Sequence, residues 1–309
     1  MNIIQGIILG FVQGLTEFLP ISSSGHLVLL QKIFALNEPT LIFDTMVHVG
    51  TLAAVMTVLW KEIFSLIKKP FQRLTWLLIA GTIPTGIIGI MFKDSFEAMF
   101  KSGSTLGFEF LATGIIILFA ERLSNGRKHI EETSFPDAVF IGVMQGVAIM
   151  PAISRSGLTI SGALMRNLDR EFAAKFSFLL SIPAIIGAAV FQVKDILDTG
   201  STGIITAPII AGTIAAAVTG YFSVRFMIVI VKKGSMKIFS YYVFALGILV
   251  LIDQYITHIF FQTPDTRYQT PELGQGFGVQ GFGASERISE KMKYTCNIQT
   301  MGNYYIIKV

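Results

Sequence analysis

The sequence contains few charged residues and almost no cysteine. Charged residues make up 14% of its 309 residues, against about a quarter in a typical soluble domain. Its single cysteine, Cys296, excludes an intramolecular disulfide and a cluster of thiolate metal ligands. The formal net charge of +4 is small, and the basic residues lie in short connections rather than in a nucleic-acid patch. These shortages argue against a soluble, disulfide-bonded or nucleic-acid-binding protein.

Motifs of soluble enzymes and of export signals are also missing. The sequence has no Walker-type phosphate loop, no H-E-x-x-H pair and no G-x-S-x-G elbow. Its start, Met1 to Ile4, has no basic region and no small-residue cleavage site follows, so we expect no removable signal peptide. Any chemistry is therefore expected from residues placed within apolar segments.

Hydrophobic residues dominate the chain. They account for 52% of it, and the mean hydropathy is +0.64. A helix needs about 20 mostly apolar residues to cross a bilayer, and six segments are predicted to do so. They are residues 43–60, 74–92, 107–121, 172–193, 205–231 and 238–260. The composition thus predicts an all-α polytopic membrane protein.

Two further apolar regions are interrupted by proline and by runs of serine and glycine. Residues 2–34 break at Pro20, and residues 137–165 break at Pro151. Each region is predicted to be a re-entrant helix hairpin that enters the membrane and returns to the same side. Such a break is tolerated at membrane depth only where it lines an enclosed or watery cavity. Two ordinary kinked spans are the alternative.

The two broken regions are near-copies of each other. The stretch Gln13–Gly25 recurs 132 positions later as Gln145–Gly157, and Ala80–Ile83 recurs 131 positions later as Ala211–Ile214. The chain is therefore predicted to form two repeats, residues 1–125 and 135–261, each with one re-entrant hairpin and three transmembrane helices. Because three is an odd number of spans, the second repeat has inverted topology.

The distribution of basic residues agrees with this inversion. They cluster after the first, third and fifth spans and before the fourth, in connections predicted to be cytoplasmic. These residues are Lys61, Lys68, Lys69, Arg73, Arg122, Arg127, Lys128, Arg166, Arg170, Lys232, Lys233 and Lys237. Both termini are then outside, and the two hairpin tips can meet near the middle of the membrane.

Residues 262–309 differ in character from the rest of the chain. They are polar, contain two Gly-Phe-Gly triplets and have no counterpart in the repeats. We expect residues 1–261 to form the membrane domain and the tail to be disordered or loosely attached. A tail foreign to the membrane domain, from a tag, a fusion or a shifted reading frame, is the alternative.

Three residues at the first break have side chains suited to acid–base and nucleophilic chemistry. Glu17 is an ionisable residue in an apolar run, which makes it a functional candidate. Ser23 and His26 are three positions apart and can share a helix face. A hydroxyl, an imidazole and a carboxylate together can activate a nucleophile or protonate a leaving group. The structural alternatives are a snorkelling or capping Glu17 and a hydrogen-bonded core histidine.

The second break carries Arg155 at the position of Ser23. A guanidinium suits phosphate oxygens, and two helix N-termini aimed at one point favour a multiply charged anion. Arg155 is therefore predicted to act with Glu17, Ser23 and His26, and an ion pair with Glu17 that only joins the repeats is the alternative. The predicted anion-binding residues are Gln13, Ser22, Ser24, Gly25, Ser154, Ser156, Gly157 and Thr159.

Other polar residues of the apolar segments are expected to have packing roles. Asp44 and His48 share a helix face, but two such groups are too few for a metal site. Glu109, Asp253 and His258 lie near span ends and are expected to snorkel or to form pairs.

The segments Gln13–His26 and Pro151–Thr159 closely resemble the undecaprenyl-diphosphatase family, also called the bacitracin-resistance protein family. The resemblance covers essentially residues 1–261. Two departures stand out: Ala152 occupies a position that is usually glycine, and Gln13 replaces a glutamate found in some members.

The resemblance implies removal of the terminal phosphate from undecaprenyl pyrophosphate, a polyprenyl lipid carrier of cell-wall synthesis, and hence bacitracin resistance. It implies a multi-pass protein of the bacterial cell membrane. We further expect the active site to open toward the outer face, where the pyrophosphate would enter. A divalent cation, Mg²⁺ or Ca²⁺, bridging Glu17 and the pyrophosphate is a further expectation, which Gln13 weakens. A transporter or flippase of polyprenyl phosphate that uses the same anion site is the rival function. The oligomeric state is open, a homodimer being one option.

Overall fold

The computed structural model describes residues 1–259 except 35, 37–40, 124–125 and 199–205. The described residues form α-helices, a short π-helix and one isolated β-bridge between Lys128 and Leu168. The all-helical prediction is therefore confirmed. The predicted tail, residues 262–309, lies outside the described residues.

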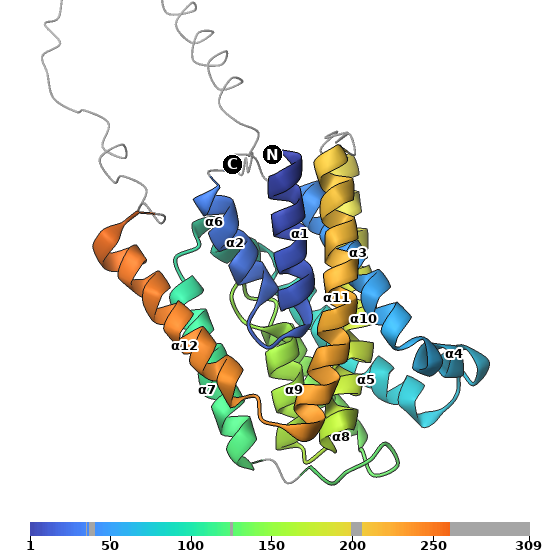
Figure 1. Ribbon diagram of the computed structural model, residues 1–309. Helices are drawn as coiled ribbons and strands as arrows, with labels where there is room; N and C mark the ends of the chain where they lie inside the picture. Colours follow the sequence, from blue (N-terminus) through green and yellow to red (C-terminus); the bar gives the residue numbers. More distant parts are fainter. Residues whose placement is uncertain (35, 37–40, 124–125, 199–205, 260–309) are drawn as a thin grey trace, which may run out of the picture. The chain divides into compact units, whose positions relative to one another are not determined.

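The helices follow one another with short connections (Figure 1). They are α1 (Ile3–Phe18), α2 (Ser23–Ile33), α3 (Leu41–Val58), α4 (Trp60–Lys68), α5 (Arg73–Met91), α6 (Lys93–Ser102), α7 (Leu106–Leu123), α8 (Phe135–Val147), α9 (Arg155–Met165), α10 (Arg170–Asp198), α11 (Ala207–Lys233), α12 (Lys237–Ile252) and the π-helix η1 (Asp253–Thr257). Helix α6 occupies a stretch that the hydropathy pattern marked only as a connection, because its residues are too polar to span a membrane.

Four helices in the described part of the chain are long and apolar enough to cross a membrane, which confirms a polytopic membrane protein. They are Arg73–Met91, Arg170–Gln192, Ala207–Lys233 and Lys237–Thr257. The pair α3 and α4, bent by 77° between them, makes a fifth span if counted as one. The remaining predicted span, residues 107–121, coincides with α7, whose eighteen residues include Glu109, Glu121 and Arg122.

Each predicted break separates two helices. Helix α1 ends just before Leu19 and Pro20, and α2 begins at Ser23; α8 ends at Val147, and α9 begins at Arg155. Ser22 precedes α2 with φ 66° and ψ 101°, in a region that side-chain-bearing residues seldom adopt. Strained backbone of this kind clusters at functional sites.

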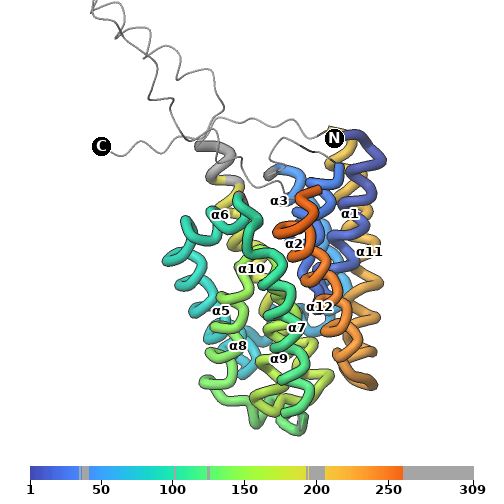
Figure 2. Tube along the Cα trace, turned by 90° about the vertical axis from the view of Figure 1, so that its left-hand side faces the viewer, coloured from blue at the N-terminus to red at the C-terminus, as the bar shows by residue number. Residues whose placement is uncertain are grey.

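Glycine pairs let helices touch through their backbones. A Cβ on Gly10 of α1 would lie 2.0 Å from the Gly212 carbonyl oxygen of α11. A Cβ on Gly142 of α8 would lie 2.0 Å from the Gly81 carbonyl oxygen of α5. Such close approach supplies the van der Waals contact that holds helices together in lipid. Figure 2 shows α1 beside α11 and α5 beside α8, so each hairpin is anchored to a long helix.

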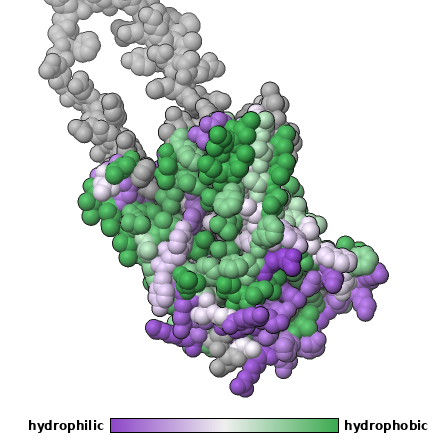
Figure 3. Space-filling model, viewed as in Figure 1, coloured by the Kyte–Doolittle hydropathy of each residue, from purple (hydrophilic) through white to green (hydrophobic). Residues whose placement is uncertain are grey.

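Apolar and hydrophilic residues are separated along the molecule. Figure 3 shows apolar residues over most of the visible face and hydrophilic residues at the end away from the N-terminus. Helix α4 and the connection between α7 and α8 lie toward that end and carry Lys61, Lys68, Arg127 and Lys128. An apolar flank with a basic end suits a protein embedded in lipid, with that end at one membrane surface.

A buried aspartate organises the connection before α8. Asp137 accepts a hydrogen bond from the backbone of Ser134, and its oxygens lie 2.6 Å from Arg166 Nε and 3.2 Å from Lys128 Nζ. Burial favours the neutral acid, but the Ser134 backbone and side chain, Arg166 and Lys128 together lower the Asp137 pKa from 3.8 to about 2. The carboxylate therefore ties the loop to the start of α8 and the end of α9.

Candidate active site

The two helix breaks are bonded to each other by serine hydroxyls. Ser22 and Ser24 both donate to the carbonyl oxygen of Pro151, the former at 3.3 Å. In the opposite direction, Ser156 donates to the carbonyl oxygen of Leu19 at 2.8 Å. Three hydroxyls predicted to face an anion are thus used to join the two tips.

Small residues make this contact close. A Cβ on Gly25 would lie 3.1 Å from the Cβ of Ala152 and 2.5 Å from the ring of Phe110. A Cβ on Gly157 would lie 3.3 Å from the Cβ of Pro20. Both predicted glycines therefore serve close packing of the two breaks, since a larger residue at either would push them apart.

Each break ends at a capped helix start, as the serine positions predicted. The Ser22 side chain accepts from Gly25 N at 3.3 Å, and the Ser154 side chain accepts from Gly157 N at 3.0 Å. Thr159, one turn into α9, bonds to the Arg155 carbonyl at 2.8 Å and fixes that first turn. The first amides of a helix have no intrahelical acceptor, so both tips keep donor groups near their meeting point.

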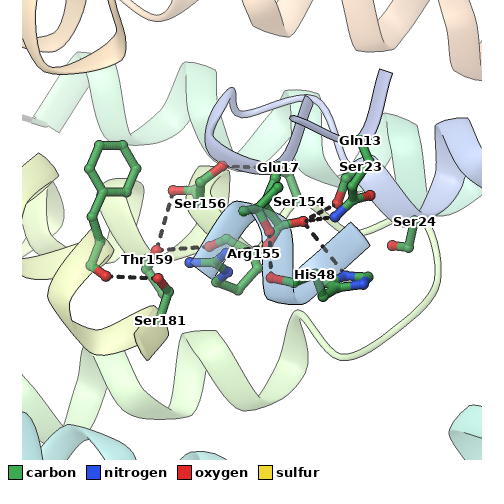
Figure 4. A network of polar contacts seen from close by, with 12 residues as sticks. Gln13, Glu17, Ser23, Ser24, His48, Ser154, Arg155, Ser156, Thr159 and Ser181 are labelled. Carbon is green, nitrogen blue, oxygen red and sulfur yellow. Dashed lines mark hydrogen bonds and ion pairs between the residues drawn. The ribbon is translucent and has the colours of Figure 1, made fainter. Parts of the chain in front are cut away.

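Glu17 stands at the centre of the site (Figure 4). Its Oε1 lies 2.5 Å from Nη2 of Arg155. Its Oε2 accepts from Ser23 Oγ at 2.6 Å and from Gln13 Nε2 at 2.8 Å. His48 Nε2 lies 3.8 Å from the same oxygen. The predicted partners Gln13, Glu17, Ser23 and Arg155 are therefore brought together by α1, α2 and α9.

Burial sets the electrostatics of this group. The Glu17 side chain is 7% exposed and that of Arg155 16% exposed, and an ion pair with several hydrogen bonds is the form in which such charges are tolerated. Arg155 Nη1 and Gln13 Oε1 are buried and have no hydrogen-bond partner among the described residues. One free donor and one free acceptor beside a paired carboxylate leave the site able to bind more polar atoms.

His26 is placed differently from the other predicted catalytic residues. Its Nδ1 lies 2.6 Å from the Ser22 carbonyl oxygen, and its Nε2 lies 2.8 Å from the hydroxyl of Tyr242. The shared face with Ser23 does not produce a hydrogen bond between them in the described structure, because the imidazole turns toward α12 instead.

Two residues that we expected to have peripheral roles lie at the breaks. His48 was expected at an interface or in packing, but α3 carries it to Glu17. Glu109 was expected to snorkel or pair near a span end, but it is buried and accepts a bond from Ala152 N at 2.5 Å. The one sequence signal for these two residues is that each is an ionisable residue within an apolar segment. That signal does not say which helix the side chain faces.

The residues fit a divalent cation only through oxygen atoms. The described residues contain no group of three or more His, Cys, Asp and Glu side chains able to hold a metal ion. Glu17 and the unpartnered Gln13 Oε1 give two protein oxygens, and Mg²⁺ is often held by one or two carboxylates together with substrate phosphates. These two oxygens are the ligands that the chain itself would offer a divalent cation.

Comparison with known proteins identifies the relatives of the chain. The family described as Bacitracin resistance protein BacA matches residues 6–249. The protein named undecaprenyl-diphosphatase from Carboxydothermus hydrogenoformans is 59% identical over 82% of this chain and 98% of that protein. Undecaprenyl-diphosphatase 4 from Bacillus thuringiensis is 51% identical over 84% of this chain and its own full length. A relative from Methanosphaera stadtmanae with the same name is 42% identical over 82% of this chain and 98% of that protein.

Proposed function

We infer that this chain, which belongs to the bacitracin resistance protein BacA family, hydrolyses undecaprenyl pyrophosphate to undecaprenyl phosphate and inorganic phosphate. The activity recycles the lipid carrier of cell-wall synthesis and confers bacitracin resistance. One observation carries the inference at the level of residues: a buried carboxylate bonds at once to a serine hydroxyl and an arginine from two different helix breaks. The enzyme is a multi-pass cell-membrane protein acting on a polyprenyl pyrophosphate lipid.

Ser23 is proposed as the nucleophile and Glu17 as its base. The hydroxyl lies 2.6 Å from Glu17 Oε2, within reach for direct proton transfer. Ser23 Oγ attacks the terminal phosphorus, its proton passes to Glu17, and the bond from that phosphorus to the bridging oxygen breaks. Water then releases phosphate from the serine. A water molecule activated by Glu17 is the alternative attacker at the same place.

Arg155 is proposed to hold the terminal phosphate. Its Nη1 is buried and unpartnered among the described residues while Nη2 bonds to Glu17, so the fork can reach carboxylate and phosphate together. When Glu17 takes up the serine proton, its attraction for the guanidinium falls. Arg155 can then follow the negative charge that develops on the phosphoryl oxygens. The helix-start amides near Ser22–Gly25 and Ser154–Gly157 are proposed to add donors at the same point.

His26 is proposed to act at the leaving oxygen, as acid or as base. A bound divalent cation would be held by Glu17 and Gln13, and the chemistry it supplies is neutralisation of pyrophosphate charge. Gln13 in turn keeps the Glu17 carboxylate oriented through its Nε2 bond.

The chain is further proposed to consist of two inverted repeats within residues 1–261, with the site opening outward. The bonds Ser24 to Pro151 and Ser156 to Leu19 support this, since each relates to the other by a shift of 132 positions. The glycine contacts of α1 with α11 and of α8 with α5 support it in the same way. The end away from the N-terminus is hydrophilic (Figure 3) and includes Lys61, Lys68, Arg127 and Lys128, which supports a cytoplasmic position for that end.

Phosphate release from undecaprenyl pyrophosphate by the purified chain in detergent tests the function. We expect release by the wild type, and loss of on the order of 100-fold or more in Arg155→Ala and Glu17→Gln. A folded wild type that releases no phosphate would favour transport of polyprenyl phosphate instead. A chain ending at Phe261 should keep full activity if residues 262–309 take no part.

A further inference from the structure

The imidazole of His26 is enclosed by three groups. The Ser22 carbonyl oxygen lies 2.6 Å from Nδ1, and the Tyr242 hydroxyl lies 2.8 Å from Nε2. The rings of His26 and Tyr242 are stacked, with centroids 5.7 Å apart and planes 7° apart. Phe110 meets the same imidazole edge-on at 5.8 Å. Tyr242 therefore contacts His26 both through its ring and through its hydroxyl.

These contacts fix the chemical form in which His26 is presented. A carbonyl oxygen only accepts hydrogen bonds, so Nδ1 must carry a proton that it donates to Ser22. In neutral His26, Nε2 then has the free lone pair and accepts from Tyr242. The Tyr242 hydroxyl therefore fixes, from the Nε2 side of the ring, the same tautomer that the Ser22 carbonyl fixes from the Nδ1 side.

Tyr242 is supplied from a well-anchored helix. Helix α12 packs on α7, where Gly247 and Gly107 approach through their backbones and Ser240 donates to the Gly114 carbonyl at 2.8 Å. The Tyr242 side chain, 46% exposed, reaches from this helix to α2. Its backbone position thus does not depend on His26, which lets the tyrosine act as a fixed point for the imidazole.

We propose that Tyr242 is a positioning residue for the proposed reaction. Its ring and hydroxyl hold the His26 imidazole in one orientation and one tautomer, with Nδ1 donating to the Ser22 carbonyl and Nε2 accepting from the Tyr242 hydroxyl. The proposal rests on the phosphatase function inferred above. It assigns a role in the reaction to α12, a helix that contributes none of the residues around Glu17.

A double-mutant cycle tests this role. Tyr242→Phe keeps the stacked ring and removes only the hydroxyl, so kcat for undecaprenyl pyrophosphate should fall roughly 3- to 10-fold, the range of one neutral hydrogen bond, with KM within about twofold. Tyr242→Leu removes the ring as well and should lose more. In a His26→Ala background, Tyr242→Phe should cause no further loss, because the group that it positions is gone.

The neighbouring Tyr241 provides the matched control. It is exposed and has no hydrogen bond or ring contact within the described part of the chain, so Tyr241→Phe should leave kcat and KM unchanged. Unfolding temperatures of the two Phe variants check that both fold equally well. Wild-type activity in Tyr242→Phe, full activity in His26→Ala, or an equal loss with and without His26 would each overturn the proposal while leaving the phosphatase function intact. A wild type without phosphatase activity would overturn both.

Discussion

Replacing Arg155 with lysine tests whether the guanidinium fork itself binds the terminal phosphate. Arg155 Nη2 bonds to Glu17 at 2.5 Å, while Nη1 is buried without a partner among the described residues. Lysine keeps the charge but has one compact ammonium head, so it cannot serve carboxylate and phosphate from two fixed positions. Loss of one charge-assisted hydrogen bond costs about 1.5–3 kcal/mol, which is roughly a 10- to 150-fold fall in kcat/KM.

Steady-state phosphate release from undecaprenyl pyrophosphate measures this effect. The unfolding temperature of Arg155→Lys should stay near that of the wild type, because the new ammonium can still pair with Glu17. Arg122→Lys is the matched control, since Arg122 is exposed at the end of α7, and it should keep full activity. An Arg155→Lys enzyme within about threefold of wild type would refute the argument that two guanidinium positions are needed.

Three further outcomes are expected. Ser23→Ala should lower kcat on the order of 10³-fold or more and abolish any phosphorylated protein trapped by rapid quench; full activity would exclude Ser23 as nucleophile. Gly142→Ala should lower the unfolding temperature, because its Cβ would lie 2.0 Å from the Gly81 carbonyl oxygen. Gly86→Ala should not, because its new Cβ would have no atom within 4 Å apart from the neighbouring backbone of its own helix. Asp137, whose pKa is lowered from 3.8 to about 2, should stabilise the fold above about pH 4 and lose that effect as the pH falls toward 2; an Asp137→Asn variant equally stable at pH 7 would contradict this.

Local sequence signals predicted the helix breaks well. Ser22 and Ser154 cap α2 and α9 as expected, because capping depends on a side chain and amides only three positions away. The duplicated motif also predicted that Glu17, Ser23 and Arg155 belong to one site. Ionisable and hydroxyl groups in apolar segments need polar partners, and the two helix breaks are where such partners are available.

Long-range partners were harder to predict. His48 faces Glu17 only because α3 passes α1, and no spacing along the chain encodes that approach. Glu109 bonds to an amide 43 positions away. The three-residue spacing of Ser23 and His26 placed them on one helix face, but the imidazole rotates to Tyr242, 216 positions away. The direction of a side chain depends on residues of other helices packed around it, and the helical periodicity of its own segment carries no information about them.

The sequence by itself determined that this protein crosses a membrane, that two broken helices interrupt its spans, and which polar residues those breaks carry. Hydropathy, capping and repetition are local properties, so they can be recognised from neighbouring residues. Only the tertiary structure decided which atoms meet: Ser23 and Arg155 on opposite oxygens of Glu17, His48 beside them, and Tyr242 on His26. Those contacts arise where close-packed helices bring distant residues together, because backbone approach at small residues fixes which side chains can touch.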